Sequence, residues 1–257
     1  MNIKMMRSFI FAFFISICLP SCFLDNDLNQ GQQQEISTEA YQVFQTSISG
    51  LSGLCFSKNA NIFLAVSDKF GIFELNKEGV VVRKLPYPDG NDFEGITINP
   101  NTGDVYLADE RLLLVYQLSK DEQSVQAVTQ VSIPNAVSNK GIEGLSYGRD
   151  TLYIVNQESP TLLIKYDLKT NIEVSRVKVE FASYLSDIFY DDFDKTLWIC
   201  DSDKKKIFHC DLSGKVMGTQ NIDYVSKAEA IVVDRVTGHA WVGCDETGKL
   251  YKIKLTI

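Results

Sequence analysis

Histidine is nearly absent from this chain: His209 and His239 are the only two in 257 residues. His209 falls in an outer strand pattern and His239 in a turn, so we expect neither of them in the central channel of the fold. A histidine general base is therefore not expected. The sequence also lacks a nucleophile elbow, a phosphate-binding glycine loop and a zinc signature. Any acid-base chemistry would fall to carboxylates.

Paired cysteine motifs are missing as well. None of the six cysteines has a Cys-x-x-Cys spacing, which argues against a zinc or redox motif. Four of them lie within apolar strand patterns, where small buried thiols are common. An oxidising compartment would permit a disulfide, but Cys200 and Cys210 are not opposite each other in their expected hairpin. We predict four free, buried thiols, at Cys55, Cys200, Cys210 and Cys244.

Positive charge is also scarce. The chain has 25 basic and 33 acidic residues, a net charge of −8. Residues 1–21 contain two basic residues and no acidic one, so without them the net charge is −10. This balance argues against nucleic-acid binding, which needs a basic surface. It favours solubility and leaves room for a cationic ligand. We expect a monomer.

The N-terminus has the pattern of a secretory signal. Lys4 and Arg7 precede the apolar run Phe9–Leu19, which is too short to span a bilayer comfortably. Leu19-Pro20-Ser21-Cys22 resembles the lipobox of bacterial lipoproteins, which implies that Cys22 carries the lipid after cleavage of the signal peptide, residues 1–21. An ordinary secretory signal with a chance cysteine is the alternative.

The segment after Cys22 is polar and rich in Gln and Asn, and it cannot bury enough apolar surface to order itself. We interpret residues 22–39 as a flexible tether and residues 40–257 as one folded domain. Attachment to the membrane through the lipid would place the protein in the cell envelope, on the periplasmic or outer-membrane face.

One short phrase recurs five times: a small or acidic residue, a Gly-like residue, and then an apolar strand. The Gly-like positions are 53, 95, 144, 187 and 230, with steps of 42, 49, 43 and 43 residues. Such a period with four strands per unit is typical of a β-propeller. We therefore predict an all-β fold with five blades of four antiparallel strands. A sixth blade is the alternative and would have to lie within the polar segment 23–50.

The last repeat has only three strands before the chain ends. Tyr41–Thr46 is a strand pattern without a partner nearby in the sequence. We expect this N-terminal strand to supply the missing outer strand and close the ring, which removes open sheet edges.

Several motifs together resemble the SdiA-regulated family of bacterial proteins. They are Asn91–Ile96, Ala108–Arg111, Gly141–Leu145 and Ala228–Ile231. The resemblance covers residues 40–257 and implies a five-bladed propeller, distantly similar to NHL-repeat propellers, with a calcium site and no established activity. The chain departs from the repeat at Asp187 and Ala230, which stand where Gly is preferred.

The residue before each Gly-like position is the candidate for chemistry. First strands of propeller blades line the central channel, so Ser52, Glu94, Glu143, Ser186 and Glu229 are expected to form one ring. Three glutamates at one axis repel each other unless a cation binds or protons remain. We predict Ca²⁺, which takes 6–8 oxygen ligands, on Glu94, Glu143 and Glu229. Spacing alone also allows these glutamates to cap hydrogen bonds between strands and loops.

A second ring follows the second strands, 14 to 16 residues later in most blades. It contains Asp68, Asp109-Glu110, Asn156–Glu158, Asp201–Asp203 and Asp245-Glu246. Both rings could share a face, although Asp and Asn also serve in turns by bonding their own backbone. Further candidate metal ligands are Glu110, Asp109, Asp187 and Asp68.

The sequence allows three functions, and it does not decide whether the protein is an enzyme. The first is an envelope-anchored lipoprotein whose calcium-binding propeller holds an unknown small ligand or protein partner. The second is a calcium-dependent hydrolase of the ester or lactone class that uses the channel carboxylates; this rests on analogy with other propellers. The third is a partner-binding module without a metal.

Overall fold

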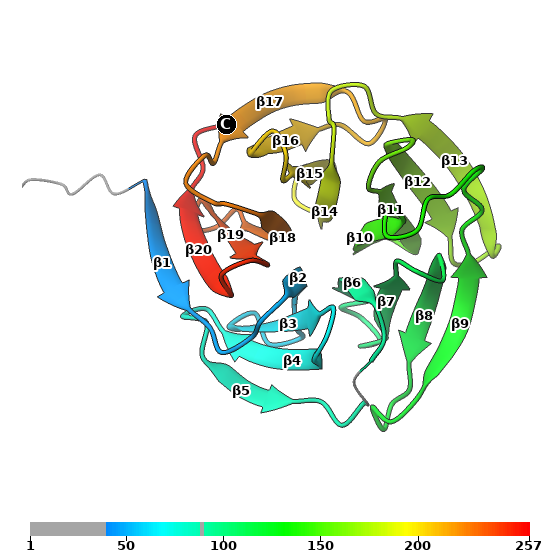
Figure 1. Cartoon of the computed structure of the whole chain (residues 1–257), viewed down its shortest axis with the longest axis horizontal. Coiled ribbons are helices and arrows are strands. Elements are labelled where there is room, and N and C mark those ends of the chain that lie inside the picture. Colours follow the sequence, from blue (N-terminus) through cyan, green and yellow to red (C-terminus); the bar gives the residue numbers. More distant parts are fainter. Residues whose placement is uncertain (1–39, 88–89) are drawn as a thin grey trace, which may run out of the picture. The chain divides into compact units, whose positions relative to one another are not determined.

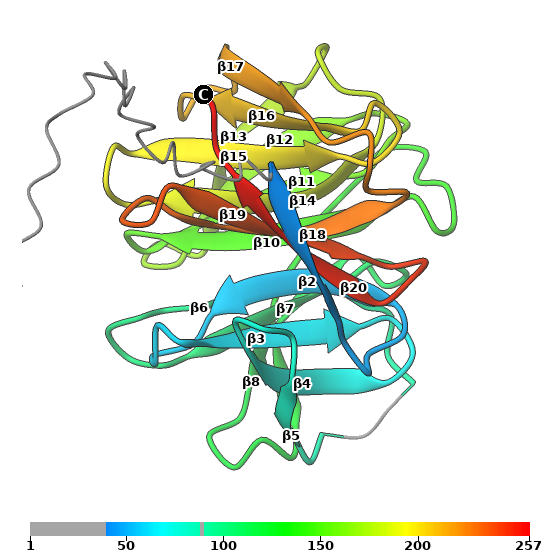
Figure 2. The same cartoon turned by 90° about the vertical axis from the view of Figure 1, so that its left-hand side faces the viewer.

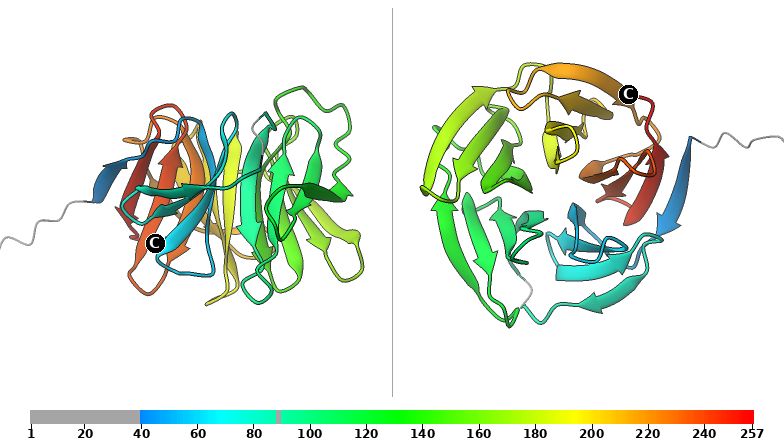
Figure 3. Two further views of the ribbon diagram at one scale, coloured as in Figure 1. Left: turned by 90° about the horizontal axis from the view of Figure 1, so that it is seen from below. Right: turned by 180° about the vertical axis from the view of Figure 1, so that it is seen from behind.

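The computed structural model describes residues 40–87 and 90–257, and all regular structure in these ranges is β-strand. Five antiparallel sheets of four strands surround a central axis (Figure 1). The innermost strands β2, β6, β10, β14 and β18 encircle that axis when the ring is seen from either end (Figures 1 and 3). The predicted five-bladed propeller is confirmed.

The first four blades follow the chain in order, each from its innermost to its outermost strand. Blade one contains β2 (Leu51–Phe56), β3 (Ile62–Ser67), β4 (Gly71–Asn76) and β5 (Val81–Lys84). Blade two contains β6 (Phe93–Ile98), β7 (Val105–Asp109), β8 (Leu114–Leu118) and β9 (Val125–Gln130). Blade three contains β10 (Ile142–Gly148), β11 (Thr151–Asn156), β12 (Leu162–Asp167) and β13 (Ile172–Lys178). Blade four contains β14 (Leu185–Asp191), β15 (Thr196–Asp201), β16 (Lys206–Cys210) and β17 (Val216–Asn221).

The fifth blade combines both ends of the domain. It contains β18 (Ala228–Asp234), β19 (His239–Cys244), β20 (Lys249–Lys254) and β1 (Tyr41–Gln45). β1 lies antiparallel beside β20, with Tyr41 opposite Ile253 and Gln45 opposite Lys249 (Figure 2). This pairing closes the ring as predicted and covers the outer edge of β20, so the last blade has four strands like the others.

Every innermost strand has a β-bulge at its start. The register shifts between Leu51 and Gly53, between Phe93 and Gly95, and at the equivalent places in the other three blades. A bulge takes one residue out of the hydrogen-bond ladder and redirects its side chain. The residue taken out is the one before each Gly-like position, so the bulge frees it from sheet packing.

The glycines of the repeat are required by close contact between blades. A Cβ on Gly53 would lie 2.4 Å from the Glu94 carbonyl oxygen, and one on Gly95 would lie 2.5 Å from that of Glu143. Innermost strands thus pack backbone against backbone around the axis. Side chains of adjacent blades fill the space farther out, for example Phe63 against Trp241 between blades one and five.

The four cysteines within the described ranges are free and buried, as predicted. None of the described residues forms a helix long and apolar enough to cross a membrane. The predicted signal peptide, Cys22 and the tether all lie outside the described residues, so they stay predictions.

Candidate functional site

A polar cavity of about 200 Å³ lies at the end of the channel where the innermost strands begin. We call it the acidic cavity. Its lining residues are all polar: Ser52, Asp68, Asp92, Glu94, Glu110, Asn139, Glu143, Gln157, Tyr184, Lys227, Glu229 and Asp245. They come from all five blades, and seven of them are carboxylates.

Three positions of the repeat supply nearly all of this lining. One is the bulged residue, such as Glu94; another is two residues earlier, such as Asp92; the third directly follows the second strand, such as Glu110. The backbone joins the last two, since the Glu110 N–H donates to the Asp92 carbonyl at 3.0 Å. The same bond recurs from Gln157 to Gly141 and from Asp245 to Lys227. The two rings predicted from the sequence therefore do share a face.

Asp92, Glu94 and Glu110 form the tightest group. One carboxylate oxygen from each lies within 4.8 Å of the others. Burial raises the pKa of Glu94 to about 8; a hydrogen bond from Ser52 opposes the rise, and the charges of Glu229 and Glu110 add to it. Burial also raises the pKa of Glu110, against a 3.1 Å hydrogen bond from the Gly141 N–H. Charged oxygens in this group are destabilised unless a cation joins them.

Lys227 neutralises the opposite side of the cavity. Its ammonium lies 2.8 Å from Glu229 Oε1 and 2.7 Å from Asp245 Oδ2. Burial lowers the pKa of Lys227, but its hydrogen bonds to Asp245 and Glu229 outweigh that effect and the net shift is upward. Burial raises the pKa of Glu229 to about 7, although Lys227 opposes the rise.

Glu143, Gln157 and Tyr184 form a third group. The Gln157 amide Nε2 donates to Glu143 Oε1 and to the Tyr184 hydroxyl oxygen. Gln157 is only 2% exposed, and its Oε1 has no hydrogen-bond partner. Burial, followed by the charges of Glu94, Glu110 and Glu229, raises the pKa of Glu143 well above its ordinary value. The cavity therefore holds a buried acceptor with an unused lone pair.

The structure brings together most of the predicted ligands. Glu94, Glu143, Glu229, Glu110 and Asp68 all line the acidic cavity. Asp109 and Asp187 do not line it. Asp109 instead bonds the backbone of its own turn, as Asp often does: its Oδ1 accepts the Leu112 N–H at 2.8 Å.

Asp187 lies inside the channel instead. Its Oδ1 accepts the N–H of Ile188 and its Oδ2 accepts that of Ile231, each at 2.8 Å. Burial raises the pKa of Asp187, while these bonds and the N–H groups of Leu54 and Leu145 lower it. Asp187 thereby contacts the innermost strands of four blades.

Sequence reasoning missed Asp92, Tyr184, Lys227 and Asn139. The first three occupy one position of the repeat, two residues before the bulged residue. Aligning the five repeats at that position would have found all three. Asn139 precedes β10 in a loop with a positive φ of 57° and carries no repeat signal.

The other mouth of the channel differs in chemistry. A cavity of about 580 Å³ opens there, with the rings of Phe56, Tyr147, Phe189 and Tyr190 in its lining. We call it the aromatic cavity. Leu54, Leu145 and Ile188, whose N–H groups reach Asp187, also line it. Asp187 therefore lies between the two cavities along β14, after the bulged Ser186 and before Ile188.

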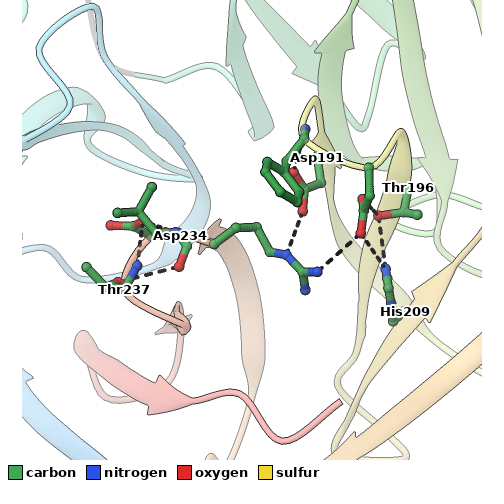
Figure 4. Close-up of polar contacts among 9 residues, drawn as sticks. Asp191, Thr196, His209, Asp234 and Thr237 are labelled. Atoms are coloured by element: carbon green, nitrogen blue, oxygen red, sulfur yellow. Dashed lines mark hydrogen bonds and ion pairs between the residues drawn. The ribbon is translucent and has the colours of Figure 1, made fainter.

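Blades four and five are clamped together near this second mouth (Figure 4). Arg235 contacts Asp191 at 3.4 Å and Asp194 at 3.3 Å. His209 Nε2 lies 2.9 Å from the Thr196 hydroxyl in the same network. Neither His209 nor His239 lines either channel cavity, as expected from the sequence.

The fold and the site define a class: a five-bladed propeller with a carboxylate-lined cavity at one channel mouth. The family model for SdiA-regulated proteins matches residues 29–251. The chain belongs to this SdiA-regulated family, which confirms the resemblance found in the sequence. No curated protein sequence matches the chain.

Solved structures share the fold at low sequence identity. Glutaminyl cyclase of Myxococcus xanthus is similar with a TM-score of 0.63 and 15% identity, over 82% of this chain and 93% of that one. An auxiliary nutrient binding protein of Bacteroides thetaiotaomicron gives 0.52 and 15%, over 79% and 58%. Virginiamycin B lyase of Staphylococcus aureus gives 0.50 and 15%, over 84% and 99%. These neighbours include enzymes and a binding protein, so the likeness establishes the fold alone.

Proposed function

We propose that this protein is a lipid-anchored envelope protein whose propeller binds Ca²⁺ in the acidic cavity and uses that cavity to hold a ligand or partner. The observation that carries the proposal is the 4.8 Å grouping of Asp92, Glu94 and Glu110 oxygens. Calcium ligands lie at about 2.4 Å from the ion, so two ligands on opposite sides are about 4.8 Å apart. The group therefore has the dimensions of a calcium coordination sphere.

The donor chemistry agrees with this choice. The cavity lining offers carboxylate, amide and hydroxyl oxygens, and it includes neither His nor Cys. Hard oxygen donors favour calcium or magnesium over zinc and copper. A bound cation would also offset the burial and the charge repulsion that keep protons on Glu94 and Glu143.

Isothermal titration of Ca²⁺ into metal-stripped full-length protein tests the proposal. We expect one site, and about a 100-fold loss of affinity in Glu94→Gln, since even outer contacts of a metal site cost up to about that much. Glu246→Gln is the matched control, because Glu246 is exposed and adjoins the cavity residue Asp245 without lining it. The absence of calcium binding, or equal affinity in Glu94→Gln, would overturn the proposal.

A calcium-dependent hydrolase of the ester or lactone class is the second candidate. It is favoured by the pKa of Glu229, which is about 7, because proton transfer is most effective near the working pH. Bound calcium would supply a Lewis acid, and Glu229, which lies outside the group of Asp92, Glu94 and Glu110, would hold and move the proton. Hydrolysis of a panel of esters and lactones that Glu229→Gln abolishes, with calcium affinity kept, would establish it.

A further inference from the structure

We propose that the organic ligand of the acidic cavity carries a protonated primary amine, bound beside Glu143 and Gln157. The inference rests on the proposed function, because Ca²⁺ and the ligand would share one cavity. It adds the chemical class of the ligand. Four observations support it: the charge of the lining, the unused acceptors, an ammonium already held there, and the size of the cavity.

The charge of the lining favours a cation. Seven carboxylates face Lys227, the one basic residue among those that line the cavity. Lys69 adds a second positive charge from outside the lining, 3.0 Å from Asp68. With every group ionised the site has a net charge of −5; with protons on Glu94 and Glu143 the charge is −3, and it is −2 when Ca²⁺ replaces the Glu94 proton. An anionic ligand would be repelled even by the calcium-loaded cavity, whereas an ammonium group would be attracted.

Two buried acceptor atoms lack a donor. Gln157 Oε1 is one, and its orientation is set because Nε2 donates to Glu143. Asp68 Oδ1 is the other. Buried acceptors without partners are costly, so the ligand should bring N–H donors. An ammonium group brings three and accepts none.

The cavity already holds one ammonium group. Lys227 Nζ is seated between Glu229 and Asp245 at 2.8 and 2.7 Å. Glu143 is buried to the same extent, but its partners are the neutral Gln157 amide and the Glu110 carboxyl group instead of an ammonium group. Glu143 could therefore bind an ammonium group as Glu229 binds that of Lys227, but none of the described residues places one beside it.

The size of the cavity restricts the group that the ammonium can be attached to. A space of about 200 Å³ with an all-polar lining suits a short alkylammonium head and gives a bulky apolar group no surface to contact. We therefore expect an unhindered primary amine, either a small molecule or an exposed amine of a larger one.

Three probes with the same number of carbon atoms test the charge requirement. Butylammonium, butyrate and 1-butanol are titrated calorimetrically into the full-length protein, both metal-stripped and loaded with Ca²⁺. We expect butylammonium alone to bind, and Glu143→Gln to weaken it by about tenfold or more, since charged hydrogen bonds contribute at least that factor. Glu246→Gln should bind it as the wild type does.

The outcomes separate this inference from the proposed function. Calcium binding without butylammonium binding, or butyrate binding as tight as butylammonium binding, would overturn the amine ligand and leave the calcium site intact. Butylammonium binding without calcium binding would overturn the calcium site and leave the amine ligand intact. If Glu143→Gln does not fold, Gln157→Leu replaces it, with the same expected loss. Unchanged amine affinity in the folded variant would place the amine elsewhere and contradict the inference.

Discussion

The two mouths of the channel are built by the same five strands and yet differ in chemistry. At the strand starts, bulged residues such as Glu94 and Glu143 line an acidic cavity. At the strand ends, the ladder is regular, and aromatic and apolar residues share the lining with polar residues and with charges of both signs. A bulged residue is left out of the hydrogen-bond ladder, so its side chain can differ from blade to blade. Functional side chains can therefore occur at these irregular positions of the repeat.

The residues near the regular ends hold neighbouring blades together. Thr97 Oγ1 accepts the Tyr147 N–H, and Ser146 Oγ accepts the Tyr190 N–H, each at 2.8 Å. Asp187 stands between the two regions and is bound by backbone from several blades. The comparison therefore predicts that changes at Asp187 and at the aromatic mouth affect stability, while changes at the acidic mouth affect cation binding.

The largest effect is expected at the boundary between the mouths. Asp187→Ala removes the acceptor for the Ile188 and Ile231 N–H groups in a fully buried place. A buried donor left without its acceptor costs about 1–3 kcal/mol, so the two donors together cost about 2–6 kcal/mol. Urea unfolding followed by fluorescence should show the loss as a lower midpoint with an unchanged slope.

Asp187→Asn is the graded control for this prediction. The amide has nearly the same shape but only one acceptor oxygen, so it keeps one of the two N–H bonds and places an NH₂ group against the other donor. We expect about half the loss of Asp187→Ala. Stability equal to the wild type in both variants would show that Asp187 does not join the blades.

The next effect is a pH dependence of the acidic mouth. The pKa of Glu94 is about 8 in the fold against an ordinary value of 4.5. Between these values the folded protein holds a proton that the unfolded chain releases, so the stability of the metal-free protein falls as pH rises through this range. From pH 6 to 8.5 we expect a loss of about 2 kcal/mol, or about 5 °C in the melting temperature.

Calcium should reverse this trend, because it binds the deprotonated carboxylates. Melting curves at several pH values, with Ca²⁺ and with a chelator, check both parts of the prediction. Glu94→Gln should flatten the pH dependence of the metal-free protein. A metal-free protein that gains stability up to pH 8.5 would mean that these carboxylates are ionised and already satisfied by the fold.

Much of the fold could be predicted because its determinants are local and repeated. The Gly-like positions recur because residues such as Gly53 and Gly95 contact the backbone of the next blade. The strand Tyr41–Gln45 could be placed because the last blade lacked an outer strand. The glutamates at the bulges could also be identified from the sequence, and Glu94, Glu143 and Glu229 do line one cavity. Both features follow from one alignment of the repeats.

The internal pairing of the site could not be predicted in the same way. Which carboxylates meet within 4.8 Å depends on side chains from different positions, and Asp92 brings its group to the Glu94 and Glu110 side. Lys227 holds Glu229 and Asp245, a pairing that spacing alone does not reveal. Asp187 looked like a ligand because it is acidic, but the backbone of other blades binds it.

The smallest effect is expected at the aromatic mouth, and it tests how separate the two mouths are. Thr97→Val keeps the shape of the side chain but leaves the Tyr147 N–H without its acceptor, so we expect a loss of about 1 kcal/mol in urea unfolding. Ser146→Ala, at the equivalent bond one blade on, should cost a similar amount. Because Asp187 lies between the cavities, neither change should alter calcium affinity in titration calorimetry. A fall in calcium affinity in both variants would show that the mouths are coupled through the innermost strands and that Asp187 transmits strain instead of separating them.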